Sequence, residues 1–178
     1  MNSDNGGPDS TGFLDGPLSA TVVNGNYDTA AFLILAGADV NAAEWTGMTP
    51  LHQAVSRNKE IAKLLISKGV DVNWKNNRGY NALHDAAQTG HEEMAALLIE
   101  SGANINESNK GNQTPLHKAA FDGRDKIVNI LIQNGANVNP VIQSTGSFNG
   151  MTPVDLALEK NRIGTVSLLR KHGGKTGE

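Results

Sequence analysis

The tetrapeptide Thr114-Pro115-Leu116-His117 organises the whole chain, because related copies of it recur at a regular interval. It is unchanged at Thr49-Pro50-Leu51-His52 and altered at Asn81-Ala82-Leu83-His84, at Thr152-Pro153-Val154-Asp155 and, most weakly, at Gly16-Pro17-Leu18-Ser19. The starts of these copies are 33, 32, 33 and 38 residues apart. A fixed period of this size is typical of stacked-repeat architectures. The spacing therefore predicts one elongated stack of five repeats.

The charge and the cysteine content argue against several classes of partner and site. Among the 178 residues, 15 Lys and Arg oppose 18 Asp and Glu, the formal charge is −3, and no basic run stands out. Nucleic acid and anionic lipid both require a basic footprint, so neither is an expected partner. The absence of cysteine excludes disulfides, thiolate metal sites and a cysteine nucleophile, although it does not settle the compartment.

The first 12 residues, MNSDNGGPDSTG, contain hardly any apolar side chains. Burial cannot offset the entropy of ordering such a segment, so we expect residues 1–12 to form a disordered tail. They also lack the basic and apolar regions of a secretion signal. The apolar stretch from Ala30 to Ala36 is among the longest and is far shorter than the roughly 20 residues of a membrane span. The sequence predicts a soluble, cytoplasmic protein that does not bind membranes.

Each repeat carries the same order of helix signals. The Thr of the Thr-Pro step suits a helix N-cap, and the Pro after it suits the first helical position, where its missing N–H costs nothing. Six residues after the His position stands a residue that tolerates positive φ in a tight turn between helices: Gly25, Asn58, Gly90, Gly123 or Asn161. A leucine-rich second helix then ends at the C-cap glycines Gly37, Gly69, Gly102, Gly135 and Gly173.

A polar segment connects each repeat to the next. After its C-cap glycine the fourth repeat reads Ala136-Asn137-Val138-Asn139, and the three repeats before it have a similar alternation. The alternation leads into a turn marked by Gly47, Gly79, Asn112 and Gly150. Each junction should therefore project a hairpin-like finger. The fourth finger is longer by five residues, within Pro140 to Phe148, and insertions in a solenoid often lie on its binding face.

These columns together closely resemble the ankyrin repeat, which reads Gly-x-Thr-Pro-Leu-His-x-Ala-Ala-x-x-Gly-His, then a leucine-rich second helix, then Gly-Ala-Asp-Val-Asn. The resemblance covers about residues 13 to 174. It implies an all-α ankyrin-repeat solenoid of helix-turn-helix units with β-hairpin-like fingers, in one domain of residues 13–178. The repeats would span about residues 13–44, 45–76, 77–109, 110–147 and 148–178. The resemblance also implies a non-enzymatic module that binds a partner protein on its finger tips and concave face.

The first and last repeats differ from the internal ones. A terminal repeat keeps one flank in water, so it tolerates polar or bulky residues in columns that are otherwise apolar or small. In the last repeat Arg170 occupies the column that holds Ile34, Ile66, Ile99 and Ile132. In the first repeat Thr21-Val22 replaces the small pairs Ala86-Ala87 and Ala119-Ala120. We therefore expect a complete five-repeat solenoid with its own caps.

The histidines do not predict a metal or catalytic site. His52, His84 and His117 occupy one column of successive repeats and should lie about one helix diameter, ~10 Å, apart. Metal bonds need ~2 Å and one point of convergence. The resemblance implies that this histidine is a structural hydrogen-bonder. Serine-nucleophile, phosphate-loop and dinucleotide signatures are also missing, so the sequence predicts no catalytic residue, no metal and no cofactor.

The candidate site consists of residues that the repeat pattern leaves free. Core packing does not ask for large apolar side chains on the fingers and the late part of the first helices, whereas aromatic residues and Arg dominate binding energy when a partner desolvates them. The predicted partner-binding residues are Trp45, Met48, Trp74, Arg78, Tyr80, Phe121, Phe148 and Met151. Arg57, Lys110 and Lys160 would join Arg78 in orienting the partner at the rim.

Two alternatives stay open at this level. Met48, Tyr80 and Met151 could pad the joint between fingers instead of contacting a partner. The exposed aromatic residues could also serve a structural, self-associating homo-oligomer without a dedicated heterologous partner. A protein-binding module, in contrast, is expected to be a monomer whose partner the sequence does not identify.

Overall fold

The computed structural model describes residues 12–177, whose regular structure consists of ten α-helices without a strand. The predicted disordered tail, residues 1–12, lies outside the described residues except for Gly12. The chain forms two compact units, of which unit 1 ends at Asp71 and unit 2 begins at Val72. Both units are all-α, as the repeat pattern predicts.

Unit 1 consists of two helix pairs. Its helices are α1 (Gly12–Val23), α2 (Tyr27–Leu35), α3 (Pro50–Val55) and α4 (Lys59–Ser67). The helix α1 packs against α3, and α2 packs against α4. Val22, Leu51 and Leu65 are almost fully buried between them, so the apolar columns of the sequence form the core.

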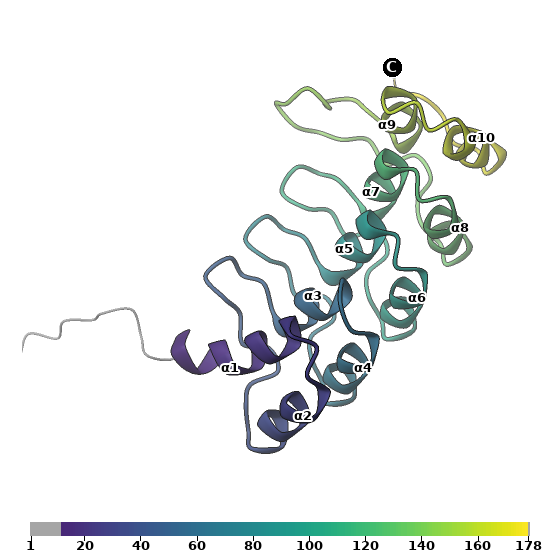
Figure 1. The fold of residues 1–178 in the computed structure, drawn as a ribbon. Helices are drawn as coiled ribbons and strands as arrows, with labels where there is room; N and C mark the ends of the chain where they lie inside the picture. The colour runs from purple at the N-terminus through teal and green to yellow at the C-terminus, as the bar shows by residue number, and fades with distance from the viewer. Residues whose placement is uncertain (1–11, 178) are drawn as a thin grey trace, which may run out of the picture. The chain divides into compact units, whose positions relative to one another are not determined.

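Unit 2 consists of three helix pairs. Its inner helices are α5 (Ala82–Thr89), α7 (Pro115–Asp122) and α9 (Pro153–Glu159), and its outer helices are α6 (Glu92–Glu100), α8 (Asp125–Gln133) and α10 (Ile163–Lys171). Inner helices pack on inner helices, and outer on outer. The connecting fingers project beside the inner helices and away from the outer ones (Figure 1). None of the helices within residues 12–177 is long and apolar enough to cross a lipid bilayer.

The Thr-Pro-Leu-His motif forms the start of an inner helix. Thr114 caps α7, and its backbone N–H donates to Nδ1 of His117 over 3.1 Å. The N–H of Asn81 makes the same bond to His84, whose Nε2 lies 3.0 Å from the carbonyl oxygen of Gln113 in the next repeat. Because Nδ1 accepts a hydrogen bond, Nε2 carries the proton of a neutral imidazole. His84 is therefore a structural link between two repeats, as the resemblance implies.

The predicted turn between paired helices has positive φ in four of the five repeats. Gly25, Gly90, Gly123 and Asn161 have φ values of 70°, 87°, 70° and 54°. The prediction is wrong for Asn58, whose φ is −151°. The second repeat lacks one residue between its helices, so Asn58 becomes the N-cap of α4 instead. Its side chain accepts hydrogen bonds from the amides of Glu60 and Ile61.

The first repeat departs from the predicted helix start as well. The pattern places Pro17 at the first helical position, but α1 begins at Gly12 and contains Pro17. Pro17 is the sixth residue of α1, where a proline removes one helical hydrogen bond and its ring crowds the carbonyl one turn before it. The helix nevertheless continues on both sides of Pro17.

The fingers are hairpin-like turns, as predicted. In the third finger the N–H of Asn109 donates to the carbonyl of Gln113, and the N–H of Asn112 donates back to the carbonyl of Asn109. Equivalent pairs of backbone bonds close the other three fingers, and the fourth holds its extra residues inside the same closure. Asn112 adopts a φ of 55°, and Gly47, Gly79 and Gly150 also have positive φ.

The asparagine at the base of each finger binds the backbone of the following repeat. In unit 2, Asn106 Oδ1 accepts from the N–H of Asn137 over 2.8 Å, and its Nδ2 donates to the carbonyl of Gly135 over 3.2 Å. Asn73 and Asn139 make the same two bonds one repeat earlier and one repeat later. We call this pair of bonds the asparagine clamp, and it joins successive repeats at a fixed register.

The residues after α10 occupy the place of a further finger. The N–H of Lys175 donates to Asn139, and the N–H of Gly177 donates to Asp155 Oδ2 over 2.7 Å. Asp155 stands in the histidine column, where an acceptor suits the amide that this segment offers. Arg170 is exposed, whereas Ile132 in the same column of the previous repeat is half-buried.

The asparagine clamp gives a stability prediction. Asn106→Ala removes one donor and one acceptor between repeats, and each hydrogen bond contributes about 0.5–1.5 kcal/mol net. We expect the free energy of unfolding to fall by about 1–3 kcal/mol in urea titrations followed by circular dichroism. Gln133→Ala, an exposed position on α8, is the matched control. Equal stability of the two variants would show that the clamp does not stabilise the stack.

Candidate functional site

Two of the predicted binding residues lie on the first finger, in unit 1. The side chain of Trp45 is 90% exposed, although core packing asks for no tryptophan there. Met48 is half-buried at the base of the same finger, and its carbonyl oxygen accepts the finger-closing bond from Glu44. Trp45 is thus almost entirely accessible, whereas Met48 belongs in part to the packing of the finger.

Three further predicted residues lie on the second finger, within unit 2. Trp74 is 37% exposed, and Arg78 is exposed near the tip. Tyr80 is half-buried at the base, where its ring meets the imidazole of His84 edge-on at 5.4 Å. The ammonium of Lys118 lies 4.8 Å from the centre of the Tyr80 ring. Tyr80 therefore joins a finger to two inner helices, which fits the padding alternative and leaves part of the side chain accessible.

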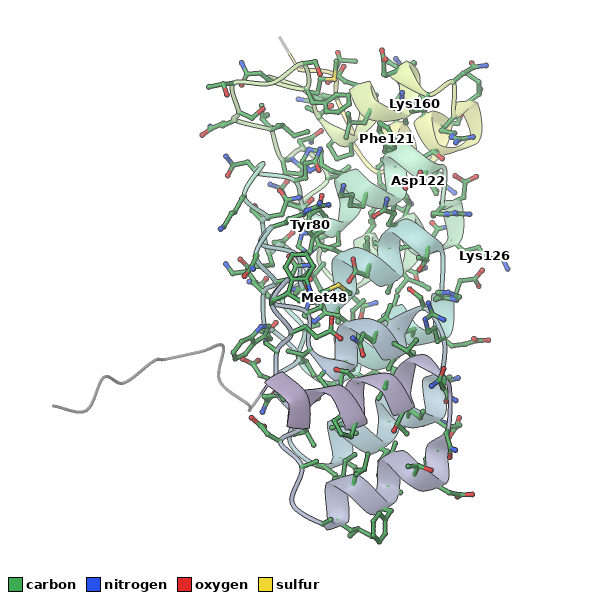
Figure 2. The ribbon with its side chains drawn as sticks, turned by 60° about the vertical axis from the view of Figure 1, so that its left-hand side comes forward. Met48, Tyr80, Phe121, Asp122, Lys126 and Lys160 are labelled. Carbon is green, nitrogen blue, oxygen red and sulfur yellow. The ribbon has the colours of Figure 1, made fainter. Side chains whose placement is uncertain are left out.

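The remaining aromatic pair is brought together from two repeats. Phe121 on α7 and Phe148 on the fourth finger meet edge-to-face, with ring centres 5.9 Å apart and ring planes at 83°. The ammonium of Lys160 lies 4.8 Å from the centre of the Phe121 ring. Figure 2 shows Phe121 and Lys160 close together, with Lys126 farther away on the outer side. Met151 is half-buried at the base of this finger, where its carbonyl accepts from Ile142.

A pocket of about 80 Å³ opens beside this aromatic pair. We call it the Phe121 pocket, and its main lining residues are Gln88, Gln113, Lys118, Phe121, Asp122 and Phe148. The buried side chains of His117 and Leu156 complete the lining. Inner helices and fingers of three repeats thus contribute to one concavity, in which an apolar wall faces polar groups.

Two carboxyl groups near this pocket have a buried oxygen without a hydrogen-bond partner among the described residues. They are Asp122, through its Oδ2, and Asp85, also through its Oδ2. Burial raises the pKa of Asp85 to about 7, and the positive charge of Lys118 opposes that rise. Asp85 therefore holds its proton to a much higher pH than an ordinary aspartate, while the Lys118 ammonium lies over the ring of Tyr80.

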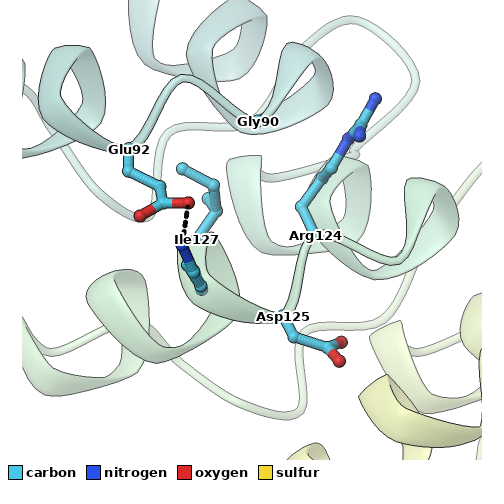
Figure 3. Close-up of a pocket in the computed structure, with 6 residues that line it drawn as sticks. Gly90, Glu92, Arg124, Asp125 and Ile127 are labelled. Atoms are coloured by element: carbon cyan, nitrogen blue, oxygen red, sulfur yellow. Dashed lines mark ion pairs between the residues drawn. The ribbon is translucent and has the colours of Figure 1, made fainter.

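A second pocket, of about 250 Å³, lies on the opposite side of the inner helices, beside the outer ones. Its charged groups are engaged within the protein: Lys126 pairs with Glu92 over 3.0 Å, and Arg124 Nε donates to the carbonyl of Gln88 over 3.0 Å (Figure 3). Asp125 accepts a hydrogen bond from the Thr165 hydroxyl. The Arg124 side chain also covers Gly90, where a Cβ would lie 3.0 Å from its Cδ. This pocket is part of the contact between two repeats.

Sequence reasoning missed Lys118 as a member of the site. Its column holds Asp85 and Leu156 in the neighbouring repeats, so no shared residue type singles it out. The one available signal was its place on the exposed side of the first helix, one turn before Asp122. Within residues 12–177 no three His, Asp or Glu side chains converge in a way that could hold a metal ion.

The buried carboxyl of Asp85 predicts a pH-dependent effect on stability. Its folded pKa of about 7 lies above the ordinary aspartate pKa of 3.8, so folding is penalised once Asp85 ionises. We expect Asp85→Asn to stabilise the protein by about 1–3 kcal/mol at pH 8, and by less at pH 5, where the folded wild type holds the proton. Urea unfolding at both pH values measures the difference.

Two histidines change the stability with pH in the opposite sense to Asp85. Comparing wild type and variant at the same pH cancels their contribution. Burial lowers the pKa of His84 and His117 to about 4, so these two side chains withdraw stability as the pH falls below 6.5. Glu100→Gln, at an exposed position on α6, serves as the control. An advantage of Asp85→Asn that grows toward acid pH would contradict the assignment of the raised pKa.

Comparison with known families identifies the repeats of this chain. A model of ankyrin repeats in three copies matches residues 18–109 and again residues 106–177. No curated protein matches the chain. Repeats of this family generally mediate protein–protein interactions, and they are typically not enzymes. Since the two matches together cover most of its length, the chain belongs to the ankyrin-repeat family.

Proposed function

We propose that this protein is a non-enzymatic binding module that recognises a partner protein through its finger tips and the exposed side of its inner helices. The observation that carries the proposal is the Phe121–Phe148 pair, which two different repeats assemble beside an open pocket. The asparagine clamp and the histidine links account for the repeated polar columns. They leave Phe121 and Phe148 without a role in the stack.

The chemistry of this face suits a protein better than a small molecule. The Phe121 pocket is too small for a drug-sized ligand, since such sites usually enclose about 300–1,000 Å³. Its aromatic wall and the exposed Trp45 instead resemble interface anchors, which contribute most of the binding energy when a partner excludes water from them. The rim cations Arg57, Arg78 and Lys110 are exposed and would steer the encounter.

Self-association is the second candidate function, and a specific surface favours it. In unit 1, Phe32 and Leu35 on α2 are 67% and 77% exposed. In the other repeats the Leu35 column holds Ser67, Glu100, Gln133 and Lys171. An apolar residue in a solvent-facing column marks a possible contact between copies. Our proposal includes a monomeric state and a cytoplasmic location. Multi-angle light scattering at micromolar concentration distinguishes a monomer from a dimer formed through α2.

Affinity capture from the native host tests the binding face. We expect the triple variant Trp45→Ala/Phe121→Ala/Phe148→Ala to lose the partner that the wild type retains. Each anchor should weaken binding by about 1–2 kcal/mol or more, which is roughly tenfold per residue. The control Phe32→Ala/Leu35→Ala also removes exposed apolar area, but from α2. Equal recovery by wild type and triple variant, or loss only in the control, would overturn the proposed face.

A further inference from the structure

We propose that the Phe121 pocket accepts a small aliphatic side chain from an extended partner segment that also carries a carboxylate, which Lys118 and Lys160 bind. This inference rests on the proposed function and adds the chemical class of the bound segment. It follows from three features of unit 2: the apolar wall of the pocket, the charges around it, and the buried oxygen of Asp122.

The apolar part of the pocket fits one small side chain. Phe121 and Phe148 form a wall through their edge-to-face contact, and Leu156 is 1% exposed in the lining. The volume of about 80 Å³ exceeds the ~10–15 Å³ that one water molecule needs. Filling it with a valine-sized side chain would remove the exposed parts of both rings from water, which is the main source of binding energy at such contacts.

The charges around the pocket favour an acidic segment. Four cations lie on the fingers and inner helices of unit 2 without an ion pair among the described residues: Arg78, Lys110, Lys118 and Lys160. Two carboxylates on the same side are already engaged, because Glu107 binds Lys75 over 2.8 Å and Asp155 accepts from the backbone of Gly177. The remaining carboxyl groups on the inner helices of unit 2 are Asp85, Asp122 and Glu159, fewer than the four cations, and burial raises the pKa of Asp85 to about 7. The free charge is therefore mainly positive there, although the whole chain carries −3.

Lys118 and Lys160 are positioned to bind the carboxylate of the partner segment together. Each ammonium lies 4.8 Å from the centre of an aromatic ring, Tyr80 for Lys118 and Phe121 for Lys160. The ring attracts the cation and limits its positions, and an ammonium has three N–H donors. The donors that point away from the ring can bind a carboxylate in charge-assisted hydrogen bonds. Phe121 thus contacts the aliphatic side chain and holds one of the cations beside it.

Asp122 supplies the third contact. Its Oδ2 lies buried in the lining of the pocket without a donor among the described residues, and an unsatisfied buried acceptor is costly. The pocket does not expose this oxygen, so a backbone N–H of the partner segment reaches it once the Asp122 side chain turns toward the pocket. An extended segment presents such a donor next to an inserted side chain. An arginine or lysine of the partner could also pair with Asp122, but it would meet the ammonium groups of Lys118 and Lys160.

Fluorescence anisotropy with three short labelled peptides tests the inference on the full chain. Each peptide carries a central valine, flanked by glutamate in the first, by glutamine in the second and by lysine in the third. We expect the glutamate peptide to bind about tenfold more tightly than the glutamine peptide, and the lysine peptide to bind most weakly. The preference should shrink as salt rises from 50 to 500 mM. Tightest binding of the lysine peptide, or no binding of any peptide, overturns the inference.

Variants locate the site. Lys118→Gln/Lys160→Gln should abolish the preference for glutamate, whereas the control Lys126→Gln removes an outer-helix cation that already pairs with Glu92 and should change nothing. Asp122→Asn should leave glutamate-peptide affinity within about threefold, because the amide oxygen still accepts an N–H. A loss of all binding in Asp122→Asn at unchanged circular dichroism contradicts the inference, because it indicates recognition of a cation.

Failure of this inference can be distinguished from failure of the proposed function. If no peptide preference is found but the captured partner still depends on Trp45, Phe121 and Phe148, the binding face stands and the acidic segment is wrong. If capture does not depend on these three residues, the face itself is wrong, whichever peptide binds.

Discussion

The two hydrogen bonds of the asparagine clamp are the constraint on which the repeat architecture depends. A single Asn side chain, such as Asn106, accepts from one backbone amide and donates to one carbonyl of the following repeat. Because both partners belong to the backbone, the contact does not vary with the neighbouring side chains. Each repeat therefore sits in the same register on the one before it in unit 2, and the inner helices and fingers line up on one side.

The regular stacking of the repeats distinguishes residues that hold the repeats together from residues that do not. The histidines are buried with lowered pKa values and act as neutral links, and the left-handed turn residues serve the backbone alone. Side chains such as Phe121, Phe148 and Lys118 carry none of these tasks. They accumulate on the finger side of unit 2, where three repeats contribute to one pocket. Substitutions at Phe121, Phe148 or Lys118 leave the asparagine clamp and the histidine links in place, because none of these three residues takes part in them.

Most of the fold could be read from the sequence, because backbone requirements recur at the repeat period. The left-handed positions at Gly90 and Asn112 were predicted correctly, since only Gly and Asn tolerate them. Asn58 was not, because a one-residue deletion turns the same residue type from a turn residue into an N-cap. The motif suggested a helix start at Pro17, whereas α1 begins at Gly12 and contains the proline. The Asn58 error occurs where the second repeat is one residue shorter than its neighbours.

By itself the sequence determined the order of the helices in each repeat, most of the helix caps and the finger turns. These properties are local, and they recur in each repeat. Only the tertiary structure decided that Phe121 and Phe148 touch, that Lys118 lies on Tyr80 and Lys160 on Phe121, and that Asp122 has a buried oxygen without a hydrogen-bond partner among the described residues. Such contacts join different repeats through side-chain directions and through the enlarged fourth finger, and these occur once in the chain and follow no period.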